Sequence, residues 1–193
     1  MSARLLTVSI TLLSTLLLLQ GCAPAVVVGG AATAAVVHDR RTFGSIIDDQ
    51  TIELKAGSAI AGDPELRGQT RINVTSMNGI VLLSGEAATI EARDRVLSLV
   101  REINGVRRIT NEMQIADTSG MGSRSLDSLI TSAVKSRLLV AKDIDVTRVK
   151  VVTDSQVVYL MGLVTRAEGD TAAGHAATID GVTRVVKVFE YID

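Results

Sequence analysis

The sequence predicts an α+β chain built from two tandem copies of one αββαβ unit, each a three-stranded mixed sheet with two helices on one face. The first observation is a repeated apolar segment: residues 79–85 reappear, in type and order, as residues 156–162, at an offset of 77 (156 − 79 = 77). The second is a repeated stop signal, Asn-Gly-Val at 104–106 and Asp-Gly-Val at 180–182, at an offset of 76 (180 − 104 = 76). Self-similarity at a nearly fixed period indicates duplicated domains.

Length and composition agree with two small domains. A unit of about 70 residues buries too little surface to be more than marginally stable alone, so we expect the two copies to pack on each other. The 193 residues carry a formal net charge of −1, which gives no basic field for nucleic acid. Tryptophan is absent, and only two Phe and two Tyr occur, which argues against platforms for base stacking.

The N-terminus predicts export. Residues 1–21 contain one positive charge, Arg4, followed by an apolar run over 5–19 that is too short for a spanning helix and is typical of a signal peptide. The run ends in Leu-Gln-Gly-Cys at Cys22, which resembles the lipobox of bacterial lipoproteins. That resemblance implies cleavage before Cys22 and its acylation, and Ala23 after it implies delivery to the periplasmic face of the outer membrane. The alternative is a buried free cysteine; Cys22 is the single cysteine, so no disulfide competes for it.

Residues 22–45 predict a lipidated tether. From 23 to 35 the chain is almost entirely Ala, Val and Gly, a composition with little to specify a fold. A buried strand through 26–28 is the alternative.

The first repeat spans 46–117. Asp48 and Asp49 precede an amphipathic stretch and are typical helix N-caps, so we expect a helix over 49–61, ended by Gly-Asp-Pro at 62–64. Asn78-Gly79 predicts a tight hairpin, because both residues tolerate a positive φ. The remaining expected elements are strands at 71–75 and 80–84, a helix at 89–103 and a strand at 106–115.

The second repeat, 124–193, follows an uncharged linker over 118–123 and runs in the same order. A helix between two strands of one sheet predicts a right-handed crossover and parallel pairing of those strands. Gly174 is a weak point within the second expected helix. The expected helices are about 127–141 and 166–179, and the expected strands are 147–153, 157–161 and 182–192.

These patterns resemble a known family. The αββαβ order, with Gly85 and Gly162 after the second strands and Gly-Val at 105–106 and 181–182 before the third, resembles the BON domain. Two such domains behind a lipobox resemble the dual-BON outer-membrane lipoproteins associated with division and phospholipid binding. The resemblance implies a non-enzymatic role in outer-membrane integrity, binding to anionic phospholipid and recruitment to division sites.

Residues suited to catalysis or metal binding are sparse. His38 and His175 are the two histidines, and neither has a Cys, His or carboxylate at ligand spacing. No nucleophile elbow, phosphate loop or dinucleotide fingerprint occurs. Asp48 and Asp49 face different ways on a helix, and capping explains them without catalysis. We therefore expect no enzyme, catalytic residue, metal site, cofactor or small-molecule substrate.

The first helix of the second repeat carries the candidate site. On a helical wheel, Ile130, Val134 and Leu138 fall on one side and predict its core face. An apolar line separated by small hydroxyls lies opposite, with basic residues on both flanks, as in a helix that rests on an anionic bilayer. The residues of this opposite face are Leu129, Ser132, Ser136, Leu139 and Val140, flanked by Lys135, Arg137 and Lys142.

Two other uses of this face stay open. The apolar line could pack against the first repeat, or it could bind outer-membrane assembly proteins as an interaction module. The family resemblance implies lipid contact on this helix, where an aromatic residue can stand in place of Leu129. The corresponding face of the first repeat predicts poor membrane binding; its residues are Thr51, Leu54, Ser58 and Ala61, beside Glu53 and Gly57.

Overall fold

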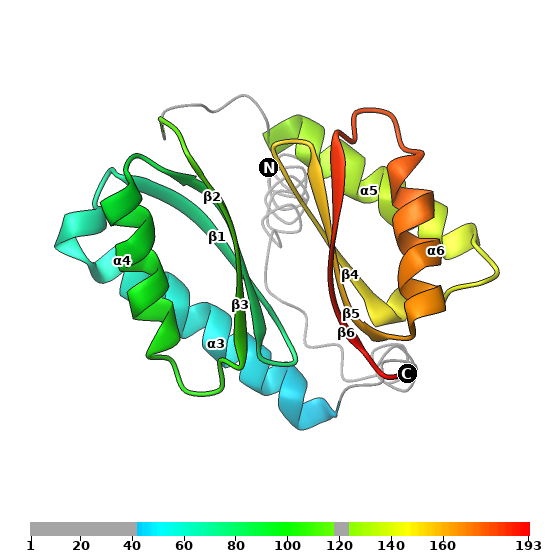
Figure 1. Ribbon diagram of the computed structural model, residues 1–193, viewed down its shortest axis with the longest axis horizontal. Helices are drawn as coiled ribbons and strands as arrows, with labels where there is room; N and C mark the ends of the chain where they lie inside the picture. The colour runs from blue at the N-terminus through cyan, green and yellow to red at the C-terminus, as the bar shows by residue number, and fades with distance from the viewer. Residues whose placement is uncertain (1–41, 118–123) are drawn as a thin grey trace, which may run out of the picture. The chain divides into compact units, whose positions relative to one another are not determined.

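The computed structural model describes residues 42–117 and 124–193, which form two αββαβ domains (Figure 1). The expected signal peptide 1–21, the lipidation site Cys22 and the linker 118–123 lie outside the described residues. The first domain contains α3 (Phe43–Gly62), the 3-10 turn η1 (Pro64–Leu66), β1 (Thr70–Met77), β2 (Ile80–Ala87), α4 (Ile90–Arg101) and β3 (Arg108–Ile115). The second contains α5 (Arg124–Val140), η2 (Val146–Arg148), β4 (Val149–Asp154), β5 (Val157–Val164), α6 (Arg166–Ala177) and β6 (Arg184–Tyr191).

Each domain holds a mixed sheet, in the orders β1-β2-β3 and β4-β5-β6. The first two strands of each sheet form an antiparallel hairpin, and the third pairs parallel with the second after the helical crossover. The predicted fold class and strand order are confirmed. Helix α6 also runs without a break past Gly174.

The first helix is longer than predicted. It begins at Phe43, not at 49, because the Thr42 side chain caps it by accepting a hydrogen bond from the Ser45 amide (3.2 Å). Residues 43–45, expected within the tether, are therefore helical. Asp49 is not the cap: it lies inside the helix and is only 3% exposed.

The central strands are also longer than predicted. Strands β2 and β5 continue past 84 and 161, so Gly85 and Gly162 lie within them rather than after them. A Cβ at Gly85 would collide with the Arg71 carbonyl oxygen of β1, and one at Gly162 with the Arg148 carbonyl oxygen. Glycine thus lets the neighbouring backbone approach at this point in both sheets.

The two sheets pack face to face, and each carries its helices on the outer face (Figure 1). Along β2, Val81 and Leu83 pack toward the helices of the first domain, whereas Ile80 and Leu82 belong to a core shared with the second domain. A strand buried on both faces has a continuous apolar run, as the central strands do over residues 80–83 and 157–161. The expected packing of the copies is confirmed. The shared core consists of Met77, Ile80, Leu82, Val157, Tyr159, Met161 and Val188.

Polar contacts surround this shared core. The Arg107 guanidinium donates to the Glu190 carboxylate (2.9 Å) and holds the pKa of that carboxyl below its ordinary value. Arg184 of the second domain donates to the Glu112 carboxylate of the first domain (2.9 Å). Inside the rim, burial raises the pKa of Tyr159 to about 12. The domains are joined by an apolar centre edged with ion pairs.

Candidate functional site

Helix α5 is fixed to the second domain by the predicted apolar line. Ile130 is 2% exposed, and Val134 and Leu138 are fully buried in the core with β4, β5 and α6. The three residues recur every four positions, so they share one face of the helix. This core prediction is confirmed.

The opposite face of α5 is exposed. Leu129 is 68% exposed, and Leu139 and Val140 are each 71% exposed, with both domains present. Packing against the first domain, one of the two alternatives, is therefore wrong for this face. Ser132 and Ser136 lie between the apolar side chains and are exposed too, and the Ser132 hydroxyl donates back to the Ser128 carbonyl oxygen (2.9 Å). The structure thus gathers the predicted apolar and hydroxyl residues on one free surface.

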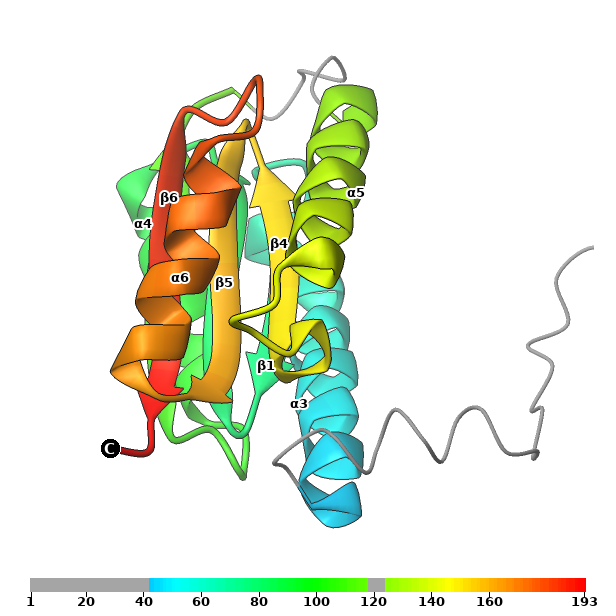
Figure 2. The same ribbon diagram turned by 90° about the vertical axis from the view of Figure 1, so that its right-hand side faces the viewer.

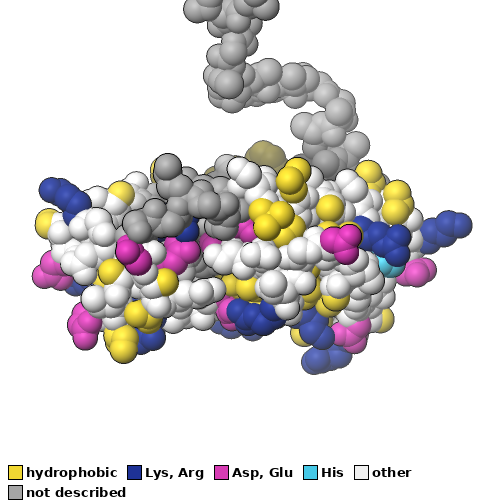
Figure 3. Space-filling model, turned by 90° about the horizontal axis from the view of Figure 1, so that it is seen from above, with side chains coloured by type: hydrophobic (Ala, Val, Ile, Leu, Met, Phe, Trp, Pro, Cys, Tyr) yellow, Lys and Arg dark blue, Asp and Glu magenta, His cyan; other side chains and the backbone are white. Residues whose placement is uncertain are grey.

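Basic side chains flank this surface. Lys135, Arg137 and Lys142 are all exposed, and none makes an ion pair with a carboxylate within residues 42–117 and 124–193. Figure 3 shows hydrophobic side chains gathered along the upper edge of the right-hand half, over the second domain, with Lys and Arg side chains toward its end. Unpaired cations beside an exposed apolar line leave their charge available to an external anion.

Two buried aspartates hold the hairpins: Asp49, which the sequence predicts as a helix cap, and Asp127, for which it predicts no role. Asp49 accepts hydrogen bonds from the Asn78 and Gly79 amides (2.7 and 2.9 Å), the two turn residues with positive φ. In the second domain, Asp127 accepts from the Ser155 and Gln156 amides (3.0 and 2.8 Å). The matching positions of the two acids in the repeats, at an offset of 78 (127 − 49 = 78), could have revealed this shared role.

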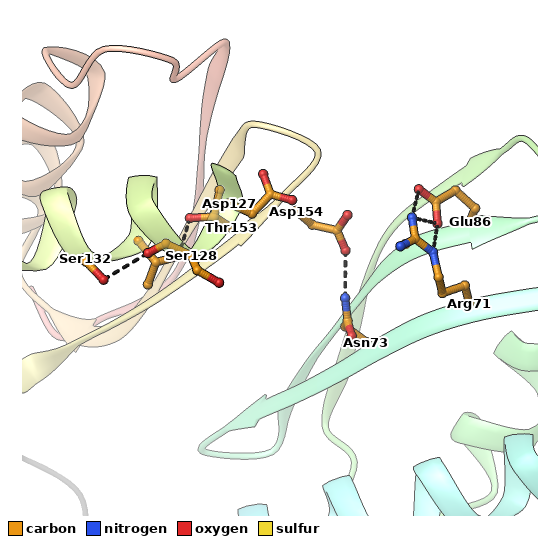
Figure 4. A pocket seen from close by; sticks show the side chains of 10 residues that line it. Arg71, Asn73, Glu86, Asp127, Ser128, Ser132, Thr153 and Asp154 are labelled. Atoms are coloured by element: carbon orange, nitrogen blue, oxygen red, sulfur yellow. Dashed lines mark hydrogen bonds and ion pairs between the residues drawn. The ribbon is translucent and has the colours of Figure 1, made fainter. Parts of the chain in front are cut away.

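A polar pocket of about 590 Å³ lies where the two domains meet (Figure 4). Its side chains largely bond one another. Arg71 pairs with Glu86 (2.7 Å), and the Asn73 amide donates to the Asp154 carboxylate across the domain boundary (2.9 Å). These polar groups hold β1 to β2 and the first domain to the second.

Within 42–117 and 124–193 no group of three or more His, Cys, Asp or Glu could hold a metal ion, and His175 is a half-buried residue of α6. No helix of this described part is long and apolar enough to cross a membrane. Asp48 is exposed and Asp49 buried, so the two carboxylates do not converge. Cys22 and His38 lie outside the described residues.

The family model of the BON domain matches residues 48–117 and 126–193. The chain belongs to the BON-domain family. This BON-domain protein is 38% identical to the outer membrane lipoprotein DolP of Haemophilus influenzae over 94% of both chains. It is 38% identical to a 21 kDa hemolysin of Actinobacillus pleuropneumoniae, over 80% of this chain and 79% of that one, and 27% identical to the osmotically-inducible protein Y of Escherichia coli K12, over 74% and 72%. It is thus an outer-membrane lipoprotein with two BON domains.

Proposed function

We propose that this protein is anchored through Cys22 to the periplasmic face of the outer membrane and binds anionic phospholipid through the exposed face of α5. The observation that carries the proposal is the exposure of Leu129, Leu139 and Val140, at 68–71%, on a helix whose opposite face is fully buried. Large apolar side chains exposed in a line on a folded domain mark an interaction surface. The basic flanks favour an anionic one.

The expected strength of this contact suits a tethered protein. Partial burial of Leu129 and Leu139 contributes on the order of 2–4 kcal/mol, taking about 1.5–3 kcal/mol for each fully buried side chain. Each of the basic residues near an anionic surface adds about 1 kcal/mol. This is weak for a free domain, but an anchor supplies an effective concentration of roughly millimolar, at which weak contacts are populated.

The resemblance to lipoproteins associated with division extends the proposal to outer-membrane integrity at division sites. Anionic phospholipid would act there as the recruiting surface. A fluorescent fusion of the Leu129→Glu variant should then lose enrichment at the division site while it stays in the outer-membrane fraction. Unchanged enrichment of this variant would show that recruitment to the division site does not depend on lipid binding by α5.

A liposome flotation assay tests the lipid contact. Residues 36–193, which include every described element, should float with anionic vesicles and stay at the bottom with zwitterionic ones. Leu129→Glu should abolish flotation without unfolding the domain, because the side chain faces away from the core. Ile90→Glu is the matched control: Ile90 is also apolar and 53% exposed, but it lies on α4 of the first domain.

The outcomes separate the candidate uses of the surface. Flotation of folded Leu129→Glu would place the lipid contact elsewhere. Failure of the wild-type fragment to bind either vesicle would favour the other candidate, an outer-membrane assembly protein docked on the same face.

A further inference from the structure

The first domain also exposes an apolar line on its first helix. Phe43, Ile47 and Leu54 of α3 are 66%, 49% and 73% exposed. Their spacings of four and seven residues place them on one side of the helix. The core residues Ile52 and Ala56 lie on the other side and are at most 2% exposed. The line exists because α3 begins at Phe43, so two of its three members precede the helix that the sequence predicted.

This α3 line carries almost no net charge. Asp49 is buried against the hairpin, and Glu53 forms an ion pair with Lys150 of the second domain (2.8 Å). The helix then presents two exposed charged residues of opposite sign, Asp48 and Lys55. A contact made by this face depends on apolar burial rather than on attraction to anions.

The position of α3 in the chain indicates that a membrane covers its exposed apolar face. Phe43 stands 21 residues after Cys22 (43 − 22 = 21), so a lipid anchor at Cys22 limits the start of α3 to within at most about 75 Å of the bilayer. Figure 2 shows α3 and α5 along the same side of the two sheets. A groove beside β1 and β4 is lined by residues of both helices, Glu53 and Gly57 of α3 and Thr131 of α5. The two helices therefore lie on one side of the body, so a leaflet on that side can contact α3 whether or not it also contacts α5.

We propose that Phe43, Ile47 and Leu54 form a second membrane contact, which inserts into the leaflet that holds the lipid anchor without preference for anionic lipid and is too weak to bind vesicles when the anchor is absent. The inference rests on the anchoring in the proposed function but not on lipid binding by α5. Two helices in contact with one leaflet fix how the two-domain body lies on the membrane. The apolar face of a helix on a bilayer sits about 5–10 Å into the boundary between headgroups and acyl chains.

Site-specific quenching tests this contact in the full, lipidated protein. Cys22 is the single cysteine. In the lipidated protein its thiol would carry the acyl group, so one introduced cysteine takes an environment-sensitive fluorophore alone. Leu54→Cys and Ile47→Cys report on α3, and Ile90→Cys on α4 is the control of similar exposure. Each labelled protein is reconstituted in phosphatidylcholine vesicles and in vesicles of phosphatidylethanolamine and phosphatidylglycerol, with and without nitroxide-labelled lipid.

Nitroxide lipid should quench the probes at 54 and 47 in both vesicle types, and the probe at 90 should keep its emission. Equal emission at 54 and 90 would overturn it. Quenching at 54 in the anionic vesicles alone would also overturn it, because the contact would then depend on charge. A blue shift at 54 that nitroxide lipid does not quench would assign the face to a protein instead.

A probe on α5 separates this inference from the proposed function. Leu139→Cys should be quenched in the anionic vesicles. If 139 is quenched and 54 is not, the α3 contact is wrong and the α5 contact stands. If 54 is quenched and 139 is not, the α3 contact stands and the lipid site on α5 is wrong.

Discussion

The first helices of the two BON domains have corresponding apolar residues on their buried faces. Their exposed faces carry different side chains. Ile52 and Ala56 of α3 correspond to Ile130 and Val134 of α5, and all four are buried. Outside, α3 exposes Phe43, Ile47 and Leu54 with little net charge, whereas α5 exposes Leu129, Leu139 and Val140 between unpaired cations. The duplicated core sets the fold, so the outer face of each first helix is free to take a different role.

The same comparison holds at the hairpins. Asp49 and Asp127 hold their turns with the same pair of backbone hydrogen bonds, although the first turn is Asn-Gly and the second is Ser155-Gln156. Ser155 and Gln156 adopt positive φ values of 51° and 64°, which L-residues with side chains adopt at a cost. The second turn therefore depends more on its aspartate than the first.

The largest expected effect is at the glycine inside the central strand. Gly85→Ala would force a Cβ against the Arg71 carbonyl at a φ of +109°. Together, crowding and strain should cost about 2–5 kcal/mol. Gly162→Ala meets the Arg148 carbonyl without a positive φ and should cost about 1–2 kcal/mol less. Urea denaturation of both variants measures the difference, and equal losses would show that strain at Gly85 contributes nothing.

The next largest loss of stability is expected from removal of Asp127. Asp127→Ala leaves two turn amides without their acceptor and should cost about 2–3 kcal/mol. Adding Gln156→Gly should recover about 1 kcal/mol, because glycine removes the positive-φ cost that the aspartate offsets. Thermal or urea unfolding of the single and double variants tests this. No recovery in the double variant would mean that turn strain is not what Asp127 counters.

A smaller effect belongs to the ion pair that edges the shared core. The pKa of Glu190 is lowered in the folded protein, so its pair with Arg107 stabilises the fold above the ordinary carboxyl value of 4.5 and is lost as pH falls through the folded pKa. Glu190→Gln should cost less than about 1 kcal/mol near neutral pH, since Arg107 is largely exposed. The difference from wild type should vanish once the pH lies below that folded pKa. A difference that persists in acid would contradict the ionic origin.

Much of the fold can be predicted from short sequence patterns. The Asn78-Gly79 turn, the apolar strands and the Gly-Val stops predict the order of the helices and strands in each domain, because turn chemistry and hydrophobic period are encoded over a few residues. The unbroken apolar runs of β2 and β5 also held information on the sheet-to-sheet packing, since such runs are typical of strands buried on both faces.

The remaining features depend on residues far apart in the chain. Arg107 and Glu190 are 83 residues apart, and nothing near either predicts the pair. The structure starts α3 before the predicted residue because Asp49, which with Asp48 is a stronger capping signal than Thr42, is instead buried against a hairpin 29 residues away. The sequence also does not decide whether the outer face of α5 is exposed, because that depends on which surface the first domain covers.

The outward faces of α3 and α5 differ in charge, and under the proposed function α5 alone selects anionic lipid. A matched pair of charge reversals tests it most directly: Lys135→Glu on α5 and Arg101→Glu, exposed in the last turn of α4. At about 1 kcal/mol for each basic residue at an anionic surface, reversal at 135 should cost about 2 kcal/mol, roughly thirtyfold in partitioning to anionic vesicles. The loss should shrink as salt rises, and Arg101→Glu should bind as wild type does. Equal losses from the two reversals, or none from Lys135→Glu in a folded protein, would show that the basic flank of α5 does not select anionic lipid.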